Sequence, residues 1–359
     1  MKAFLPYAEF YITNVCNFNC PGCARFNNFQ FAGTQRWEDY SEQYRQWADI
    51  VDIDRWAILG GEPMTNPTYL DWLDGLCKLW PQSRGSIVSN GHYFKSDNQR
   101  LYNILQSTNG LVKLEIGLHN RSRLEDITTR VRTWLKGNIT EWRGPKDYDE
   151  LYGFADNWRH SYRSIKDPAW PDCDDWHDWI NLSESIRDEC EHQHRVTPDL
   201  VAETRQDFMF CDSNGVIVRV AFEDWFTQPA LIADMEQKEF RLHHSDPVQA
   251  HDICTAKTCH TFDKGRLFKC GLVNLFKEFD QQFGISVTDE ERELLHSYQP
   301  AMLDNDPEDI VKFIEQINNP IDQCRFCPTQ SDNYKITAGS GQKPVMPKRK
   351  ITWLNATHN

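Results

Sequence analysis

Residues 10–23 read Phe10-Tyr-Ile-Thr-Asn-Val-Cys16-Asn-Phe-Asn-Cys20-Pro-Gly-Cys23, an apolar run that leads directly into three closely spaced cysteines. The aromatic and β-branched residues of Phe10–Ile12 are typical of a buried strand. We therefore expect the cysteine loop to begin where a strand ends. Three thiols within eight residues can surround one metal centre, so this stretch predicts a fold element and a site together.

The first 140 residues alternate short apolar runs with amphipathic stretches. The runs predicted as strands are Phe10–Ile12, Trp56–Leu59, Ser86–Val88 and Leu114–Leu118, and the stretches predicted as helices are Tyr40–Ile53, Tyr69–Trp80 and Asn98–Gln106. This alternation indicates parallel βαβ units, and hence an α/β fold with an open sheet or a barrel. In such folds the chemistry lies at the carboxyl ends of the strands, and the unusual residues of this chain follow its strands.

The remaining chain divides into four parts. Residues 137–200 hold five tryptophans among many charged residues and are predicted as a helical insertion in a core that spans residues 1–240. Phe208–Cys211 and Val216–Val220 flank a turn sequence and are predicted as a hairpin. Residues 241–335 are predicted as a second, cysteine-rich unit, and residues 336–359 as a flexible tail.

Composition and charge exclude several classes of protein. Apolar residues make up 40% of the 359 residues and charged residues 26%, which is typical of a soluble globular protein. No apolar run approaches the length of about 20 residues that spans a bilayer, and the N-terminus lacks a secretory pattern, so a cytoplasmic location is expected. A net charge of −14 disfavours nucleic acid and anionic lipid as partners.

Twelve cysteines are unusual for a chain expected in a reducing compartment, where disulfides are rare. Their spacing separates two clustered sets from isolated cysteines, for which simple packing is the expected role. The N-terminal set is Cys16, Cys20 and Cys23, the C-terminal set is Cys254, Cys259, Cys270, Cys324 and Cys327, and the isolated ones are Cys77, Cys173, Cys190 and Cys211.

The N-terminal set has no fourth protein ligand nearby. Structural zinc uses four protein ligands, whereas three thiolates leave one coordination position open. An open, soft site of this kind suits an iron–sulfur cluster that binds an exogenous group. Structural or zinc-binding cysteines remain the alternative.

The Cys-x3-Cys-x2-Cys spacing resembles that of the radical S-adenosylmethionine superfamily. Gly60-Gly61-Glu62-Pro63, after the second predicted strand, resembles the segment that binds the methionine amino group in that family. Ser89-Asn90, after the third, is similar to its polar contact with the ribose, and His119, after the fourth, stands where the family often has a polar residue near the cofactor. Glycines would let backbone approach the ligand, and the carboxylate of Glu62 would suit an ammonium.

This resemblance implies a partial (βα)6-type barrel and an enzyme. S-adenosylmethionine and a 4Fe–4S cluster on Cys16, Cys20 and Cys23 would be its cofactors. An electron from an external reductant, such as flavodoxin or ferredoxin, would cleave S-adenosylmethionine, and the 5′-deoxyadenosyl radical would then remove a hydrogen from substrate.

The C-terminal set resembles the SPASM and twitch extensions of the same family. Cys259 and Cys270 enclose Gly265, and Cys324-x2-Cys327 follows after a long gap. The shorter twitch form implies one auxiliary 4Fe–4S cluster, with either Cys254 or Cys259 as the further ligand. A zinc ribbon built from the same thiolates is the alternative.

The resemblance implies that the substrate is a peptide, or a small amino-sugar-like or nucleoside metabolite. The rival interpretation is a non-catalytic metal protein, either an iron–sulfur electron carrier or a zinc-stabilised interaction module. Gly60–Pro63 and Ser89–Asn90 distinguish the two, because such a protein has no need for a cofactor-binding surface at its strand ends.

Overall fold

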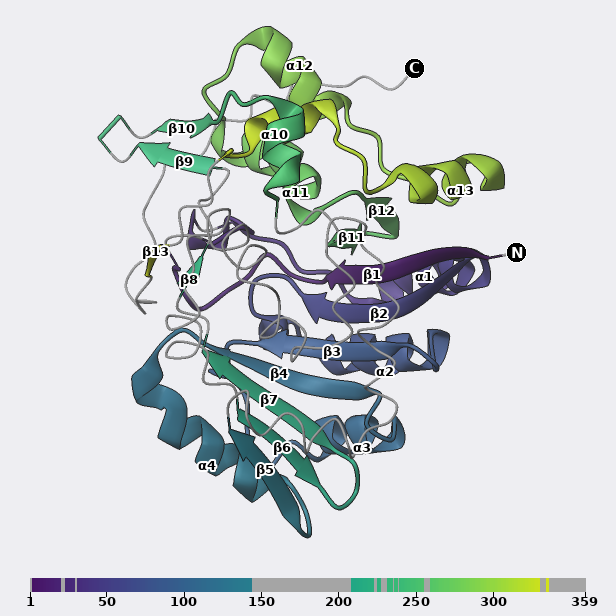
Figure 1. Cartoon of the computed structure of the whole chain (residues 1–359), viewed down its shortest axis with the longest axis vertical. Coiled ribbons are helices and arrows are strands. Elements are labelled where there is room, and N and C mark those ends of the chain that lie inside the picture. Colours follow the sequence, from purple (N-terminus) through teal and green to yellow (C-terminus); the bar gives the residue numbers. More distant parts are fainter. Residues whose placement is uncertain are drawn as a thin grey trace, which may run out of the picture.

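The computed structural model describes residues 2–20, 23–29, 31–143, 208–222, 225–226, 231–234, 236–237, 239–254, 259–329 and 334–335. Within these ranges nine strands form one sheet (Figure 1). Their spatial order is β12 (Arg266–Phe268), β11 (His260–Asp263), β1 (Ala3–Tyr11), β2 (Val51–Leu59), β3 (Arg84–Ser89), β4 (Val112–Leu118), β7 (Ile217–Phe222), β6 (Phe208–Asp212) and β5 (Ile139–Arg143).

The centre of this sheet is parallel. The parallel pairs are β11–β1, β1–β2, β2–β3, β3–β4 and β4–β7, so six neighbouring strands share one direction. The outer pairs β11–β12, β7–β6 and β6–β5 are antiparallel. The predicted α/β class with a largely parallel sheet is confirmed, and the sheet stays open between its edge strands β12 and β5, as in a partial barrel.

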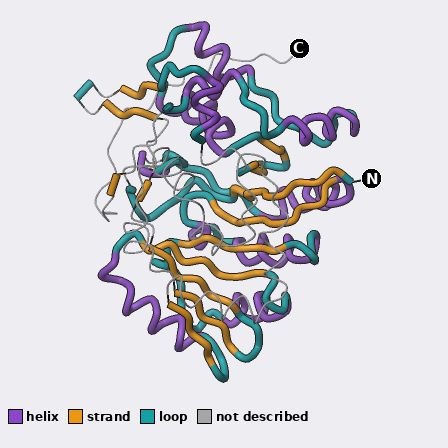
Figure 2. The backbone as a smooth tube through the Cα atoms, in the orientation of Figure 1, coloured by secondary structure: helices purple, strands orange, loops and turns teal. Residues whose placement is uncertain are grey.

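Helices connect the first four strands, as the periodicity predicts. They are α1 (Trp37–Ile50), α2 (Tyr69–Leu79) and α3 (Gln99–Ser107); a further helix, α4 (Leu124–Trp134), which the sequence did not predict, follows β4. Figure 2 shows the helices α1 to α3 lying along the sheet. Their buried aromatic side chains pack on the strands: Trp47 of α1 and Trp72 of α2 are fully buried, and the ring of Tyr44 lies 5.4 Å from that of Phe10 on β1.

The predicted start of the insertion is wrong. The sequence predicts helical structure from residue 137, whereas Ile139–Arg143 is the edge strand β5 and pairs with β6 over its whole length. The β-branched Ile139 and Thr140 favour a strand, and the edge of β6 supplies hydrogen-bond partners for it. Residues 144–200 of the predicted insertion and Cys173 and Cys190 lie outside the described residues, as does the predicted tail 336–359.

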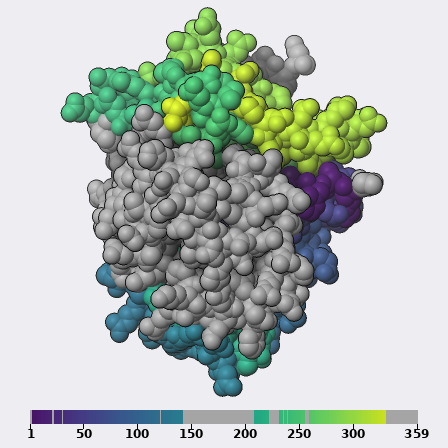
Figure 3. Space-filling view, viewed as in Figure 1, coloured from purple at the N-terminus to yellow at the C-terminus, as the bar shows by residue number. Residues whose placement is uncertain are grey.

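The segment 241–335 adds helices at one end of the molecule (Figures 1 and 3). They are α10 (Pro247–Asp252), α11 (Gly271–Phe283), α12 (Asp289–Ser297) and α13 (Pro307–Gln316). The same segment supplies β11 and β12 to the main sheet, through the parallel pairing of β11 with β1. Two small antiparallel pairs lie outside that sheet, β9 (Leu231–Asp234) with β10 (Glu239–Leu242), and β8 (Trp225–Phe226) with β13 (Tyr334–Lys335). No helix in the described ranges is long and apolar enough to cross a membrane.

A second apolar cluster joins the cysteine loop to α11. We call it the phenylalanine cluster; its central members are Phe26, Phe29 and Phe31 of the loop and Phe276 and Phe279 of the helix. All five are nearly excluded from solvent. The ring of Phe279 lies 5.1 Å from that of Phe26 and 5.7 Å from that of Phe31.

We predict that Phe279→Ala lowers the free energy of unfolding by about 3–5 kcal/mol, because it removes a fully buried aromatic ring and leaves a cavity. The matched control is Phe4→Ala, since Phe4 is 54% exposed and its loss is expected to change stability by less than about 0.5 kcal/mol. Urea unfolding followed by circular dichroism measures both. Equal effects for the two variants would contradict this role of the cluster.

Candidate functional site

The parallel register brings the predicted site residues to one edge of the sheet. Tyr11, the last residue of β1, is paired with Leu59, the last residue of β2, and Ser89 at the end of β3 is paired with Ile116 near the end of β4. The cysteine loop, Gly60–Pro63, Ser89–Asn90 and His119 therefore all leave the sheet at its carboxyl edge. The four segments were predicted to meet there, and the structure places them there.

Gly60 and Gly61 pack against the backbone of the cysteine loop. Gly61 N donates to Thr13 O at 2.7 Å, and Glu62 N donates to Val15 O at 2.8 Å. A Cβ atom on Gly60 would clash with Thr13 O, and one on Gly61 would clash with Val15 O. The sequence predicts close approach to a ligand at these glycines, and the structure adds a second reason for them, which is close approach to the loop that carries Cys16.

The carboxylate of Glu62 is fully buried and connects two strand ends. Its oxygens accept hydrogen bonds from Asn90 N at 2.7 Å, from Ser89 Oγ at 2.8 Å and from Met64 N at 3.0 Å. Burial raises the pKa of Glu62, and these three hydrogen bonds act in the opposite direction. Whereas the sequence suggests an ammonium as its partner, the carboxylate already has three donors within the chain.

Asn90 links the end of β3 to the cysteine loop. Its Nδ2 donates to Asn17 Oδ1 at 2.9 Å and lies 4.0 Å from Cys16 Sγ, and its Oδ1 accepts from His92 N at 2.9 Å. The ring of Phe18 in the same loop lies 6.1 Å from that of His119. The loop is thus connected to β2, β3 and the end of β4 before any ligand is considered.

The three N-terminal cysteines lie on this loop, and each makes a local contact there. Cys16 Sγ accepts from Phe18 N at 3.4 Å, Cys23 N donates to Cys20 O at 3.1 Å, and Cys23 Sγ lies 3.7 Å from Asn27 Oδ1. In the described part of the chain, no three His, Cys, Asp or Glu side chains converge on the position of one metal ion. An iron–sulfur cluster spreads its thiolate ligands over several irons, and a donor set made only of thiols fits the chemistry of such a cluster.

The C-terminal cysteines come from distant segments to one neighbourhood. Cys254 follows α10, Cys259 precedes β11, Cys270 precedes α11, and Cys324 and Cys327 lie at the short helix Asp322–Phe326. Burial raises the pKa of the Cys327 thiol, and Cys270, Cys254 and Cys324 raise it further. Burial also raises the pKa of Cys259, with added contributions from Glu9, Cys254 and Cys270. Cys254 and Cys259 are both neighbours of the set, so each remains a candidate ligand.

The sequence reasoning missed two buried cations close in sequence to the cysteines. Arg25 forms an ion pair with Glu9 on β1, and Lys269 is buried beside Cys270. Glu9 gave a usable signal, because a carboxylate within an otherwise apolar buried strand needs a partner. No sequence pattern identified that partner as Arg25.

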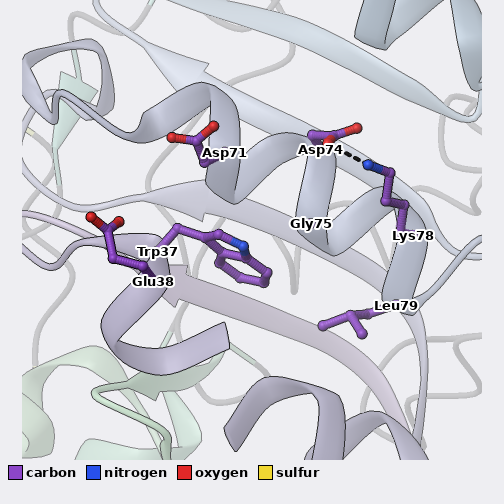
Figure 4. Close-up of a pocket in the computed structure, with 7 residues that line it drawn as sticks. All are labelled: Trp37, Glu38, Asp71, Asp74, Gly75, Lys78 and Leu79. Carbon is purple, nitrogen blue, oxygen red and sulfur yellow. Dashed lines mark hydrogen bonds and ion pairs between the residues drawn. The ribbon is translucent and has the colours of Figure 1, made fainter. Parts of the chain in front are cut away.

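A pocket in the described residues lies away from this edge. It is a shallow groove of about 500 Å³ between α1 and α2 on the helical side of the sheet (Figure 4). Its lining includes Trp37, Gly75 and the ion pair of Lys78 with Asp74 at 2.6 Å. None of the predicted site residues lines it, so the groove is not part of the candidate site.

We predict that Glu62→Gln lowers the stability of the ligand-free protein by about 1–3 kcal/mol, because the amide turns an N–H group toward a buried donor. The matched control is Glu42→Gln, where an exposed carboxylate is paired with Arg45 and little change is expected. Urea unfolding without ligand measures the effect, and calorimetry with S-adenosylmethionine tests the predicted loss of binding. A carboxylate that serves a ligand alone would leave ligand-free unfolding unchanged.

Comparison with known proteins gives limited similarity. No family model matches the chain, and no curated protein matches it. Similar solved structures include BtrN in complex with AdoMet and 2-DOIA (19% identity, TM-score 0.26, 33% of this chain and 47% of that chain). Others are Streptococcus suis SuiB bound to S-adenosylmethionine (17%, 0.30, 45% and 39%) and anSMEcpe with bound AdoMet (13%, 0.29, 36% and 40%). The matched part is less than half of each of these chains, and at TM-scores this low the functional assignment rests on the motifs and contacts above.

Proposed function

We propose that this chain is a radical S-adenosylmethionine enzyme. The observation that carries the proposal is the hydrogen-bonded surface at the carboxyl edge of the sheet. There the cysteine loop, Gly60–Pro63 and Ser89–Asn90 are joined by the bonds from Gly61 to Thr13, from Ser89 and Asn90 to Glu62, and from Asn90 to Asn17. An electron carrier or a zinc module has no use for three strand ends connected around one cysteine loop.

Cys16, Cys20 and Cys23 would hold a 4Fe–4S cluster with one open iron, and Gly60–Pro63, Ser89–Asn90 and His119 would contact S-adenosylmethionine. When bound, the cluster supplies one electron for the cleavage of S-adenosylmethionine, and the resulting 5′-deoxyadenosyl radical takes a hydrogen from substrate. The chain's own share is to orient the cofactor and to hold the strand ends rigid. The buried Glu62 carboxylate fixes Ser89 and Asn90 relative to Gly60–Pro63, so that the proposed contacts are preorganised.

Charged side chains on β4 and β7 favour a polar substrate. Glu115 on β4 forms ion pairs with Lys113 at 2.6 Å and with Arg219 of β7 at 3.3 Å. Although burial raises the pKa of Glu115, Lys113 and Arg219 bring it below the ordinary value of a glutamate, which keeps the carboxylate charged. A peptide, or a small amino-sugar-like or nucleoside metabolite, carries groups that such charges can bind.

The C-terminal cysteines would hold one auxiliary 4Fe–4S cluster, with Cys270, Cys324 and Cys327 as ligands and Cys254 or Cys259 as a further one. The thiol of Cys327 is buried, and its pKa is raised by that burial and by the charges of Cys270, Cys254 and Cys324, which supports this assignment. The cluster would accept the electron left on the substrate after hydrogen removal. Flavodoxin or ferredoxin would supply the electron for the first cluster.

Radical formation is the direct test of the function. Anaerobic protein, incubated with dithionite and S-adenosylmethionine, is expected to release 5′-deoxyadenosine, measured by mass spectrometry. Cys20→Ala should abolish the release, and Cys77→Ala, which changes an isolated cysteine on α2, should not. Absence of 5′-deoxyadenosine from a sample that carries iron would contradict the proposal.

We predict about eight irons per reconstituted chain, which corresponds to two 4Fe–4S clusters. Changing Cys16, Cys20 and Cys23 together to Ala should remove about half of that iron, since the C-terminal set keeps its own ligands. Iron and zinc are measured in the same anaerobic sample. Near-stoichiometric zinc without iron would favour the zinc-stabilised interaction module.

We predict that changing Cys324 and Cys327 to Ala preserves the formation of 5′-deoxyadenosine and abolishes product, because radical formation needs only the N-terminal set. Metal ligation also stabilises the fold, so circular dichroism must first show that the variant is folded. Products from candidate peptides and small metabolites are identified by mass spectrometry. Product formation at the parent rate would make the C-terminal site structural.

A further inference from the structure

Arg25 is fixed next to the last cysteine of the N-terminal set. Phe26 N donates to Cys23 O at 3.1 Å, which closes a tight turn around Arg25. Phe26 has a φ of 60°, a conformation that costs free energy for an aromatic residue. Its ring stacks on Phe276 of α11 at 5.8 Å, so packing against that helix holds the turn in place.

The guanidinium of Arg25 turns away from solvent toward the sheet. It forms its ion pair with Glu9, and the two side chains are only 18% and 7% exposed. It also lies 5.9 Å from the centre of the Tyr11 ring. Removal of two charges from water costs free energy, and the pairing of Arg25 with Glu9 offsets part of that cost.

The same guanidinium reaches the C-terminal set. A Cβ atom on Gly271 would coincide with Nη1 of Arg25, so the cation occupies the space directly over the first residue of α11. Cys270 precedes that residue, and Arg25 acts electrostatically on Cys259 as well. The N-terminus of a 13-residue helix carries a partial positive charge, which disfavours a cation there unless anions lie nearby.

Lys269 adds a second buried cation to the same region. It is 3% exposed, and its Nζ donates to Ile317 O at 2.6 Å and lies 3.5 Å from His251 Nε2. Among the described residues no carboxylate is within ion-pair distance of it. Cys270, Cys324 and Cys254 interact with it electrostatically. Among the described residues Glu9 is the one carboxylate paired with either cation, and a thiolate-bound cluster would neutralise the positive charge that remains.

We propose that Arg25 is a positioning residue that couples the two cysteine sets. Its charge lies between the turn at Cys23 and the Cys270–Gly271 end of α11. There it favours the reduced state of a cluster at either site. Lys269 lies by the C-terminal set and acts on that site alone. The proposal rests on the proposed function for the identity of the two clusters. Each reduction adds one negative charge to a cluster, so a nearby cation raises its reduction potential and a nearby anion lowers it.

Redox titration of the anaerobic full chain, followed by electron paramagnetic resonance, tests this coupling. The C-terminal cluster is measured in the Cys16, Cys20 and Cys23→Ala background, and the N-terminal cluster in the Cys324 and Cys327→Ala background. Arg25→Gln is expected to lower both potentials, each by at least tenfold in the one-electron equilibrium constant, which is 59 mV. Lys269→Met should lower only that of the C-terminal cluster, and the exposed control Arg45→Gln neither.

Two further variants separate charge from structure. Arg25→Lys keeps the cation and should restore most of the potential, whereas Glu9→Gln removes the anion and should raise both potentials. Because Glu9→Gln changes the potentials in the opposite direction, it still tests the proposal if Arg25→Gln fails to fold. Two outcomes overturn the coupling if both clusters are present: Arg25→Gln changes the reduction potential of only one cluster or of neither, or Glu9→Gln lowers a reduction potential. Either outcome leaves the proposed function unaffected.

If the parent protein instead takes up zinc without iron, the proposed function is wrong. The electrostatic effect of Arg25 on the two cysteine sets is then tested by adding zinc to the metal-free chain. Zinc bound by thiolates is also anionic, so Arg25→Gln should then weaken zinc binding to each cysteine set at least tenfold, measured by chelator competition in the same two cysteine backgrounds. Arg45→Gln again serves as the control. Unchanged zinc affinity at either set overturns the coupling.

Discussion

Neighbouring parallel strands end side by side, but the loops that follow them are not connected by the hydrogen bonds of the sheet. In this chain the buried carboxylate of Glu62 supplies that connection, because it accepts hydrogen bonds from Ser89, Asn90 and Met64 at once. The backbone of the same segment is paired with Thr13 and Val15 of the cysteine loop. The relative positions of the cysteine loop and two strand ends thus depend on one buried carboxylate, at a place where an unmatched donor or acceptor is costly.

The second structural dependence is apolar and of long range. The phenylalanine cluster fixes the cysteine loop on α11, and β11 from the same segment pairs with β1. The sequence predicts 241–335 as a separate unit because its cysteines form a set of their own. The contacts show that this segment also holds the N-terminal loop in place, so a change at the C-terminal set can reach the first one through packing and through Arg25.

Local patterns predicted the central fold well, and the reasons are physical. The first four strands and the helices α1 to α3 follow from hydrophobic periodicity, and the hairpin of β6 and β7 follows from its turn sequence, whereas α4 was not predicted. The pairing of β7 with β4 and of β11 with β1 depends on contacts between distant residues, which periodicity does not encode. The same holds within the site: Gly60–Pro63 and Ser89–Asn90 were recognised as motifs, but the bonds of Glu62 to Ser89 and of Arg25 to Glu9 join residues that no local pattern connects.

The docking of Phe26 on Phe276 has a consequence for how the protein is made. The two residues are 250 positions apart, so a ribosome that adds about 5–20 residues per second completes the anchor roughly 12–50 s after the loop. During that interval Cys16, Cys20 and Cys23 have neither the helix that fixes their loop nor the strand β11 that covers one side of β1. A nascent chain that stalls before α11 therefore has a cysteine loop without the packing partner of Phe26, and the thiols of Cys16, Cys20 and Cys23 are less protected in it than in the folded protein.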